Sequence, residues 1–109
     1  MAVSTRIAPP NSLILIEDSN GGDVPTSMNR SLIVATESCI AVGCRCEVDG
    51  ETEIMLEHCS NVDTGDVLEF EGRLRTPSRR ITIRTTHDVT LLEMPVAGTM
   101  TTLRIWVND

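Results

Sequence analysis

The sequence predicts an all-β protein: an antiparallel β-sandwich of about seven strands, with a small β-barrel as the alternative. Three observations lead to this class. Two consecutive β-hairpin patterns fill the chain from Ile40 to Thr86, short strand patterns bounded by turn residues recur elsewhere, and no window combines helical periodicity with helix caps. Short strands at this spacing are typical of sandwiches and small barrels.

Length and the N-terminal sequence define the expected domain organisation. The 109 residues match the commonest size of a single domain, which we place at residues 12–109. Residues 1–11 end near Pro9-Pro10 and are expected to form a flexible arm. Within the domain, Ser12 to Asp18 is a continuous apolar strand candidate that a cluster of turn residues ends, and Arg30 to Thr36 is the next strand.

The first hairpin pattern turns at Val48-Asp49-Gly50-Glu51, where Asp-Gly between alternating residues is a strong hairpin signal. A two-residue loop would place Glu53 and Glu57 among apolar side chains. A three-residue loop instead pairs Cys46 with Ile54 and separates an apolar face from an acidic one. We therefore expect the longer loop.

The second hairpin pattern turns at Thr76-Pro77-Ser78-Arg79, where proline suits the second position of a type I turn. A four-residue loop would pair Leu74 with Ile81 on one face of the hairpin. The same register would place Glu71 opposite Arg84 on the other face, as a cross-strand ion pair of the weak surface kind.

The remaining strand signals lie within and after this hairpin. Gly72 falls in the middle of a strand, which suggests a bulge or a close approach of another part of the chain. Asp88 to Met94 and Thr99 to Val107 are the last two strands, with a turn between them. With one Phe, one Trp and no Tyr, the core is expected to be aliphatic.

Composition limits the classes of partner. A net charge of −7 disfavours nucleic acid and anionic membranes and favours basic partners. No stretch is long and apolar enough to cross a bilayer, and the first residues lack the pattern of a signal peptide. The expected location is therefore the cytoplasm, by default.

The four cysteines do not form a zinc motif, because no Cys-x-x-Cys pair is present. In the expected register Cys44 and Cys46 point into the core beside His58, so a three-ligand metal site is a minor alternative to buried, inert side chains. Cys39 and Cys59 fall on the opposite face. Their geometry allows a disulfide, which a reducing cytoplasm does not favour.

No catalytic or cofactor signature is present. Cys59 directly follows His58, but adjacent strand residues face opposite sides of a sheet and cannot act as nucleophile and base. His87 and Asp88 share this defect. The phosphate loop, the G-x-S-x-G elbow and the H-E-x-x-H motif are also missing, so we expect a protein that is not an enzyme and has no cofactor.

The charges divide the chain into two halves. From residue 37 to residue 71 there are ten carboxylates against one arginine, and from 73 to 84 there are five arginines and no acid. The ordinary interpretation is a solvated sheet surface. The functional interpretation assigns partner binding to an acidic hairpin edge and anion binding or self-association to an arginine face. The acidic set is Glu47, Asp49, Glu51, Glu53 and Glu57, and the arginine set is Arg73, Arg75, Arg79, Arg80 and Arg84.

The layout of the chain also resembles the bacterial competence nuclease-inhibitor family. The resemblance rests on the Val-Asp-Gly-Glu-Thr-Glu turn, on Glu69-Phe70-Glu71-Gly72, on Leu74-Arg75-Thr76-Pro77-Ser78, and on the final Leu103-Arg104-Ile105-Trp106-Val107 strand. It spans about residues 30 to 107 and carries over no inhibitor residue. It implies a small acidic β-sandwich that binds and restrains a nuclease.

Together these patterns favour a non-enzymatic protein-binding module, an inhibitor or immunity-type partner of a basic enzyme such as a nuclease. One alternative is a binding domain for a small ligand or metal. Another is a structural module that assembles with copies of itself into a homo-oligomer.

Overall fold

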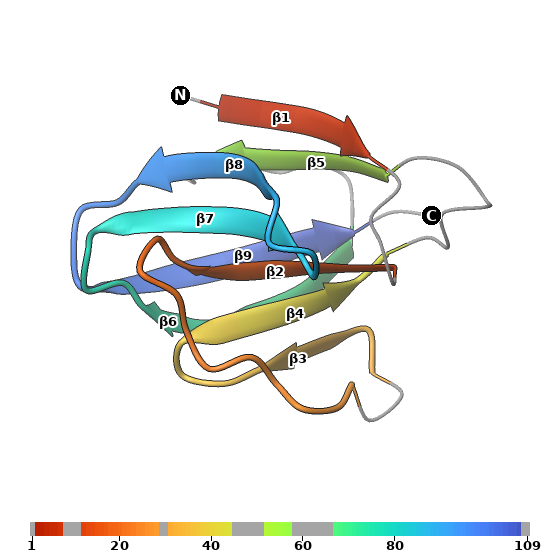
Figure 1. The fold of residues 1–109 in the computed structure, drawn as a ribbon, viewed down its shortest axis with the longest axis horizontal. Coiled ribbons are helices and arrows are strands. Elements are labelled where there is room, and N and C mark those ends of the chain that lie inside the picture. The colour runs from red at the N-terminus through yellow and green to blue at the C-terminus, as the bar shows by residue number, and fades with distance from the viewer. Residues whose placement is uncertain (1, 8–11, 29–30, 45–51, 58–66, 108–109) are drawn as a thin grey trace.

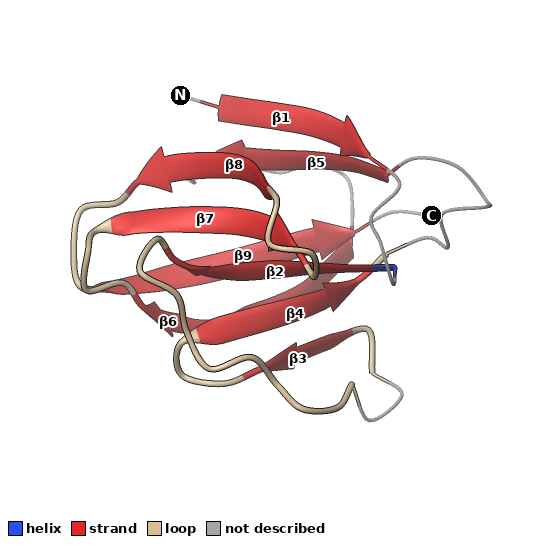
Figure 2. Ribbon diagram, in the orientation of Figure 1, coloured by secondary structure: helices blue, strands red, loops and turns tan. Residues whose placement is uncertain are grey.

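The protein is described by a computed structural model over residues 2–7, 12–28, 31–44, 52–57 and 67–107. These residues form strands and connecting loops without an α-helix, so the all-β prediction is confirmed (Figure 2). The strands are β1 (Ala2–Ile7), β2 (Leu13–Asp18), β3 (Ile33–Ala35), β4 (Cys39–Gly43), β5 (Thr52–Glu57), β6 (Val67–Arg75), β7 (Arg80–Thr85), β8 (Thr90–Pro95) and β9 (Met100–Val107).

Every strand pair is antiparallel. Five strands form one sheet in the order β3-β4-β2-β7-β8, while β6 pairs with β9 and β1 pairs with β5 as two-stranded ribbons. The β6–β9 ribbon lies behind the five-stranded sheet in Figure 1, and the β1–β5 ribbon lies beyond β8. The arrangement is a β-sandwich-like fold whose layers enclose one main core.

The main core is aliphatic, as the composition predicts. Alternation along β2 and β7 turns one side chain in two toward the interior. Ile40 and Leu74 are fully buried and come from the two layers, and Ile54 of β5 joins the same cluster. Burying an aliphatic side chain of this size stabilises the fold by about 1.5–3 kcal/mol, so this shared core holds the ribbons against the sheet.

The first predicted hairpin is wrong. β5 pairs with β1, with Ile54 opposite Thr5, whereas β4 pairs with β2 on one side and β3 on the other. Because both edges of β4 are occupied, β5 finds its partner in the N-terminal segment. The flexible arm expected over residues 1–11 therefore differs from the structure, in which residues 2–7 form β1. The turn residues 45–51 lie outside the described residues.

The second hairpin is also wrong, although its turn exists. Arg79 donates its backbone N–H to the carbonyl of Thr76 at 2.9 Å, as a β-turn requires. The turn nevertheless joins two layers, because β6 pairs with β9 and β7 pairs with β2 and β8. Thr76 is fully buried, and its hydroxyl donates to the Gly98 carbonyl at 2.7 Å. This anchor to the β8–β9 connection directs β6 toward β9.

The pairing of β6 with β9 changes the predicted ion pair and explains Gly72. Glu71 faces Arg104 and forms an ion pair with it, not with Arg84. A side chain at Gly72 would lie 2.8 Å from the ring of Phe70, which crosses the glycine, and the register shifts between Leu68 and Phe70. Gly72 thus accommodates a close contact, with a side chain of its own strand, whereas the bulge lies before Phe70 and not at Gly72.

Candidate functional site

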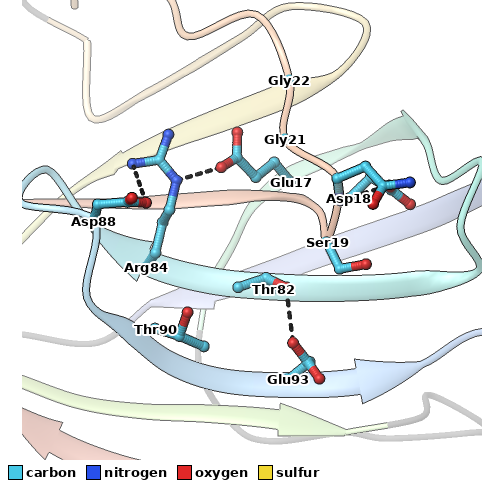
Figure 3. Close-up of a pocket in the computed structure, with 11 residues that line it drawn as sticks. Glu17, Asp18, Ser19, Gly21, Gly22, Thr82, Arg84, Asp88, Thr90 and Glu93 are labelled. Atoms are coloured by element: carbon cyan, nitrogen blue, oxygen red, sulfur yellow. Dashed lines mark hydrogen bonds and ion pairs between the residues drawn. The ribbon is translucent and has the colours of Figure 1, made fainter.

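A polar groove lies on the outer face of the five-stranded sheet (Figure 3). It has a cavity volume of about 330 Å³ and runs between β2, β7, β8 and the chain segment that follows β2. Its side chains are almost all polar or charged. Those that carry the argument below are Glu17, Asp18, Thr82, Arg84, Asp88 and Glu93.

Strand alternation places most of these side chains on the outer face, whereas Asp18, opposite the core residue Ile81, points to the other side of the sheet. Ile16 and Ile83 face the main core, so their neighbours Glu17, Thr82 and Arg84 face outward. The strand register then aligns one polar row across the sheet. Within it Glu17 lies opposite Cys39 on β4 and opposite Thr82 on β7, and Thr82 lies opposite Glu93 on β8.

A buried ion pair forms the floor of the groove. Arg84 donates from Nε to Oε1 of Glu17, with side-chain exposures of 18% and 4%. The other oxygen, Oε2, is buried and has no hydrogen-bond partner. The hydrogen bond to Glu17 raises the pKa of Arg84 against the opposing effect of burial. Removing one partner of such a pair typically costs about 3–5 kcal/mol, so the pair is strongly coupled to the fold.

Cys39 lies beside this floor as the cross-strand neighbour of Glu17. It is fully buried, in a small second cluster with Leu15 and Ala41. Burial first, and then the negative charge of Glu17, raise the pKa of the thiol to about 12. Because the thiolate is the nucleophile, a thiol with this pKa is inert at neutral pH.

The predicted metal and disulfide alternatives find no support in the part of the chain that is described. Cys39 and Cys44 are free thiols, and burial also raises the pKa of Cys44. No three His, Cys, Asp or Glu side chains among the described residues come together to hold a metal ion. Cys46, Cys59 and His58 lie outside those residues.

One rim of the groove is the β7–β8 turn, which Thr85 organises. Its hydroxyl accepts the backbone N–H groups of His87 at 3.2 Å and Val89 at 3.3 Å. Asp88 adopts a φ of 63°, a conformation that aspartate tolerates better than most residues. Its 90% exposed carboxylate lies 3.9 Å from Nη1 of Arg84, which is beyond direct hydrogen-bond distance.

The opposite wall is the segment from Ser19 to Asp23, which is tied down at both ends. At its start the Asp18 carboxylate accepts Asn20 N–H at 3.0 Å and both the N–H and hydroxyl of Ser78, at 3.0 and 2.7 Å. At its end Asp23 donates its N–H to the hydroxyl of Ser38 at 2.8 Å. The wall is therefore held in place by polar contacts with two other parts of the chain.

Between these anchors the wall consists of two glycines. Gly21 has a φ of 92°, which favours glycine, and a Cβ built there would meet nothing within 4 Å. A Cβ at Gly22 would lie 2.1 Å from the carbonyl oxygen of Ser38, so only glycine fits there. At these two positions the wall places no side chain in the groove, which Ser19 and Asn20 also line.

The sequence-predicted arginine face is split by the fold. Arg73 and Arg75 lie on β6, whereas Arg80 and Arg84 lie on β7 in the five-stranded sheet. Arg79 is exposed in the turn between the two layers. The five arginines therefore do not form one anion-binding surface.

Most of the predicted acidic edge lies beyond the described residues, which exclude Glu47, Asp49 and Glu51. Glu53 is exposed on β5 and lies 3.5 Å from Arg6 of β1. Glu57 ends β5, opposite Ala2. With β5 paired to β1, this segment is not the edge of the expected hairpin.

Sequence reasoning missed the groove residues Glu17, Asp88 and Glu93 as a group. Glu17 follows an apolar run, and its partner Arg84 is 67 positions away. The available signal was local: a carboxylate at an outward position of a strand, followed by a turn with Gly21-Gly22.

No family model matches the chain, and no curated protein or solved structure matches it. Among the described residues, no helix has the length and apolar character needed to cross a membrane.

Proposed function

We propose that this protein is a non-enzymatic binding module that holds a basic partner against the outer face of its five-stranded sheet. One observation carries the proposal. The groove on this face is lined by the carboxylates of Glu17, Asp88 and Glu93 and by one arginine, Arg84, and the buried Asp18 adds a further negative charge beside it. Such a surface attracts cationic groups and repels anionic ones, which favours a basic partner and selects against others.

The chemistry of the groove supports binding over catalysis. Asp18 is fixed by three hydrogen bonds, and Glu93 accepts from Nε of Arg80 at 2.8 Å. The Cys39 thiol, with a pKa of about 12, is no nucleophile. Asp18 and Glu93 are thus held as fixed charges.

Two further observations point to a basic protein. The net charge of −7 adds long-range attraction for a partner of opposite charge. The layout resembles the competence nuclease-inhibitor family, whose members bind a nuclease. An inhibitor or immunity-type partner of a basic enzyme is accordingly the form of the proposal that we favour.

A small cationic ligand is a second candidate. The cavity volume of about 330 Å³ lies at the lower end of the range for small-molecule sites. The polar, charged lining of the groove suits a compact polar cation better than an apolar ligand.

The test is affinity capture from bacterial lysate at low and moderate salt, followed by affinity measurement with the purified partner. The groove variant Glu17→Gln/Asp88→Asn/Glu93→Gln is compared with Glu37→Gln/Glu69→Gln/Glu71→Gln, which removes the same charge from exposed sites outside the groove. We expect wild type and control to retain one basic protein. The groove variant should bind this protein at least about tenfold more weakly, which is a loss of about 1.4 kcal/mol or more in binding free energy.

Circular dichroism checks that each variant is folded. If the triple groove variant does not fold, the double variant Asp88→Asn/Glu93→Gln replaces it in the binding measurement. A third variant, Glu51→Gln/Glu53→Gln/Glu57→Gln, tests the acidic segment expected from the sequence. Loss of binding in that variant or in the control, with the groove variant unaffected, would overturn the assignment to the groove. Recovery of no basic protein would overturn the proposal as a whole.

A further inference from the structure

We infer that Glu17 is the receptor of a guanidinium group, supplied by an arginine side chain of the basic partner. This inference rests on the proposed function and adds the chemical group and the residue that receives it. Glu17 is 4% exposed, it lines the groove, and one of its two carboxylate oxygens has no hydrogen-bond partner. Arg84 occupies only the other oxygen.

An unpartnered oxygen on a buried carboxylate calls for a donor. Buried polar atoms in native proteins are nearly always hydrogen-bonded to protein, water or ligand, and a charged group left without a partner is costly. The terminal torsion of a glutamate side chain is broad, so the carboxylate can turn to bring this buried oxygen toward a donor in the groove. A bound donor would therefore complete the hydrogen bonding of Glu17.

The charges favour a cationic donor. Glu17 is balanced by Arg84, and Glu93 is balanced by Arg80, whose Nη2 lies 2.6 Å from the Glu93 carboxylate. Asp88 remains without a close partner for its charge, because its contact with Arg84 is 3.9 Å. Arg84 already lies between Glu17 and Asp88, so a second cation, bound beside Arg84 in the groove, would complete the contacts of both carboxylates.

Among biological cations, guanidinium suits this position best. It is less strongly hydrated than an ammonium ion, so it loses less hydration energy when it contacts the buried Glu17 carboxylate. It also presents several N–H donors in one plane, which can reach the acceptors of the floor and the rim together. The glycine wall opposite the rim places no side chain in its way.

The test is an NMR titration of the full-length protein, labelled in the side-chain carboxyl carbons and the backbone amides. The probes are methylguanidinium, methylammonium and a blocked Gly-Arg-Gly peptide, each at constant ionic strength. We expect saturable shifts at the Glu17 carboxyl carbon and the Gly21 amide with both guanidinium probes. Methylammonium should bind at least about fivefold more weakly, because its hydration is stronger.

Variants establish the position of the site. Glu17→Gln should abolish the saturable shifts, Asp88→Asn should weaken binding severalfold, and Glu71→Gln on the β6–β9 ribbon should leave it unchanged. If Glu17→Gln does not fold, the shift of the wild-type Glu17 carboxyl carbon and the affinity of Asp88→Asn still test the position of the site. Shifts that fail to saturate, equal binding of methylammonium, or an unaffected Glu17 signal would each overturn the inference.

The source of the guanidinium is read from the same titration. Tighter binding of the peptide than of methylguanidinium supports a protein arginine, whereas the reverse order would overturn that source in favour of a free small guanidinium compound. Failure of the Glu17 site can be distinguished from failure of the proposed function. A basic partner that is lost on Asp88→Asn/Glu93→Gln but kept on Glu17→Gln would overturn the Glu17 site while leaving the acidic groove as the binding surface.

Discussion

At the scale of single residues, Asp18 shows how a buried carboxylate can serve the scaffold of a site. The residue is 1% exposed, and burial alone would raise its pKa. Hydrogen bonds from Asn20 and from the N–H and hydroxyl of Ser78 outweigh burial and hold the pKa below the ordinary value of 3.8. The charged form therefore ties the groove wall to the β6–β7 turn.

The depressed pKa of Asp18 gives a pH-dependent contribution to stability. This contribution is fully present above about pH 3.8 and is lost as the pH falls through the lower pKa of the folded state. We expect Asp18→Asn to lower the free energy of unfolding by about 2 kcal/mol at pH 7, because hydrogen bonds to a charged group are lost. Urea unfolding of both proteins from pH 7 down to pH 2.5 should show the gap narrowing below about pH 4. A gap of constant size across the series would contradict this account, and Glu71→Gln provides a surface control.

The candidate site could be predicted from the sequence only in part. The sequence placed Cys39 on the face opposite the main core, which agrees with the structure, but its burial there in a second small cluster was not predicted. The Glu17–Arg84 pair could not be anticipated, since it requires knowing that β2 lies beside β7. The expected Glu71–Arg84 pair failed for the same reason, because its members belong to different layers. Charge patterns along a chain locate surfaces only when the strand order is known.

At the scale of elements, most strand positions were predictable, β1 excepted, and strand partners were not. The strands expected at Ser12 to Asp18 and at Thr99 to Val107 agree with β2 and β9 to within one residue. The Pro77 turn was also located correctly. Alternation and turn residues are local properties, however, and the same alternating strand can pair with any neighbour. Long-range anchors such as the buried Thr76, bound to the Gly98 carbonyl, decided the pairing.

The pairing of β1 with β5 leads to a prediction about the N-terminus. Val3 and Ile7 are half-buried against the main core, and β1 covers one edge of β5. Deleting residues 1–7 should therefore lower the free energy of unfolding by about 2–4 kcal/mol through lost apolar burial. Hydrogen exchange should accelerate at β5 amides before those of β7.

Arg6→Gln is the matched control for this deletion. It removes only the exposed Arg6–Glu53 ion pair, which is worth about 0–1 kcal/mol. A deletion that costs no more than this control, with unchanged exchange at β5, would restore the flexible arm that the sequence suggested.

At the scale of the whole molecule, shape and charge come from separate parts of the sequence. Aliphatic side chains from the sheet and both ribbons build the main core. The charge of the molecule comes from 16 carboxylates and nine arginines. The described ion pairs link neighbouring strands, such as Arg104 with Glu71 and Arg80 with Glu93. The described ion pairs join five arginines to six acids, because Arg84 contacts both Glu17 and Asp88. The other ten acids and four arginines of the chain carry most of the net negative charge.

This excess charge predicts that salt stabilises the protein. Surface ion pairs such as Arg104–Glu71 contribute about 0–1 kcal/mol each, and salt weakens them. Repulsion from a net charge of −7 acts over a longer range, and raising the ionic strength from roughly 0.01 to 0.15 M shortens the screening length from about 30 to about 8 Å. We expect the melting temperature at pH 7 to rise by about 4 °C in NaCl over this range, which corresponds to about 1 kcal/mol. The same series near the isoelectric point of about 4.7 should show little change, because the net repulsion is then absent. A melting temperature that falls with salt at pH 7 would mean that the cross-strand ion pairs outweigh the repulsion that comes from the net charge.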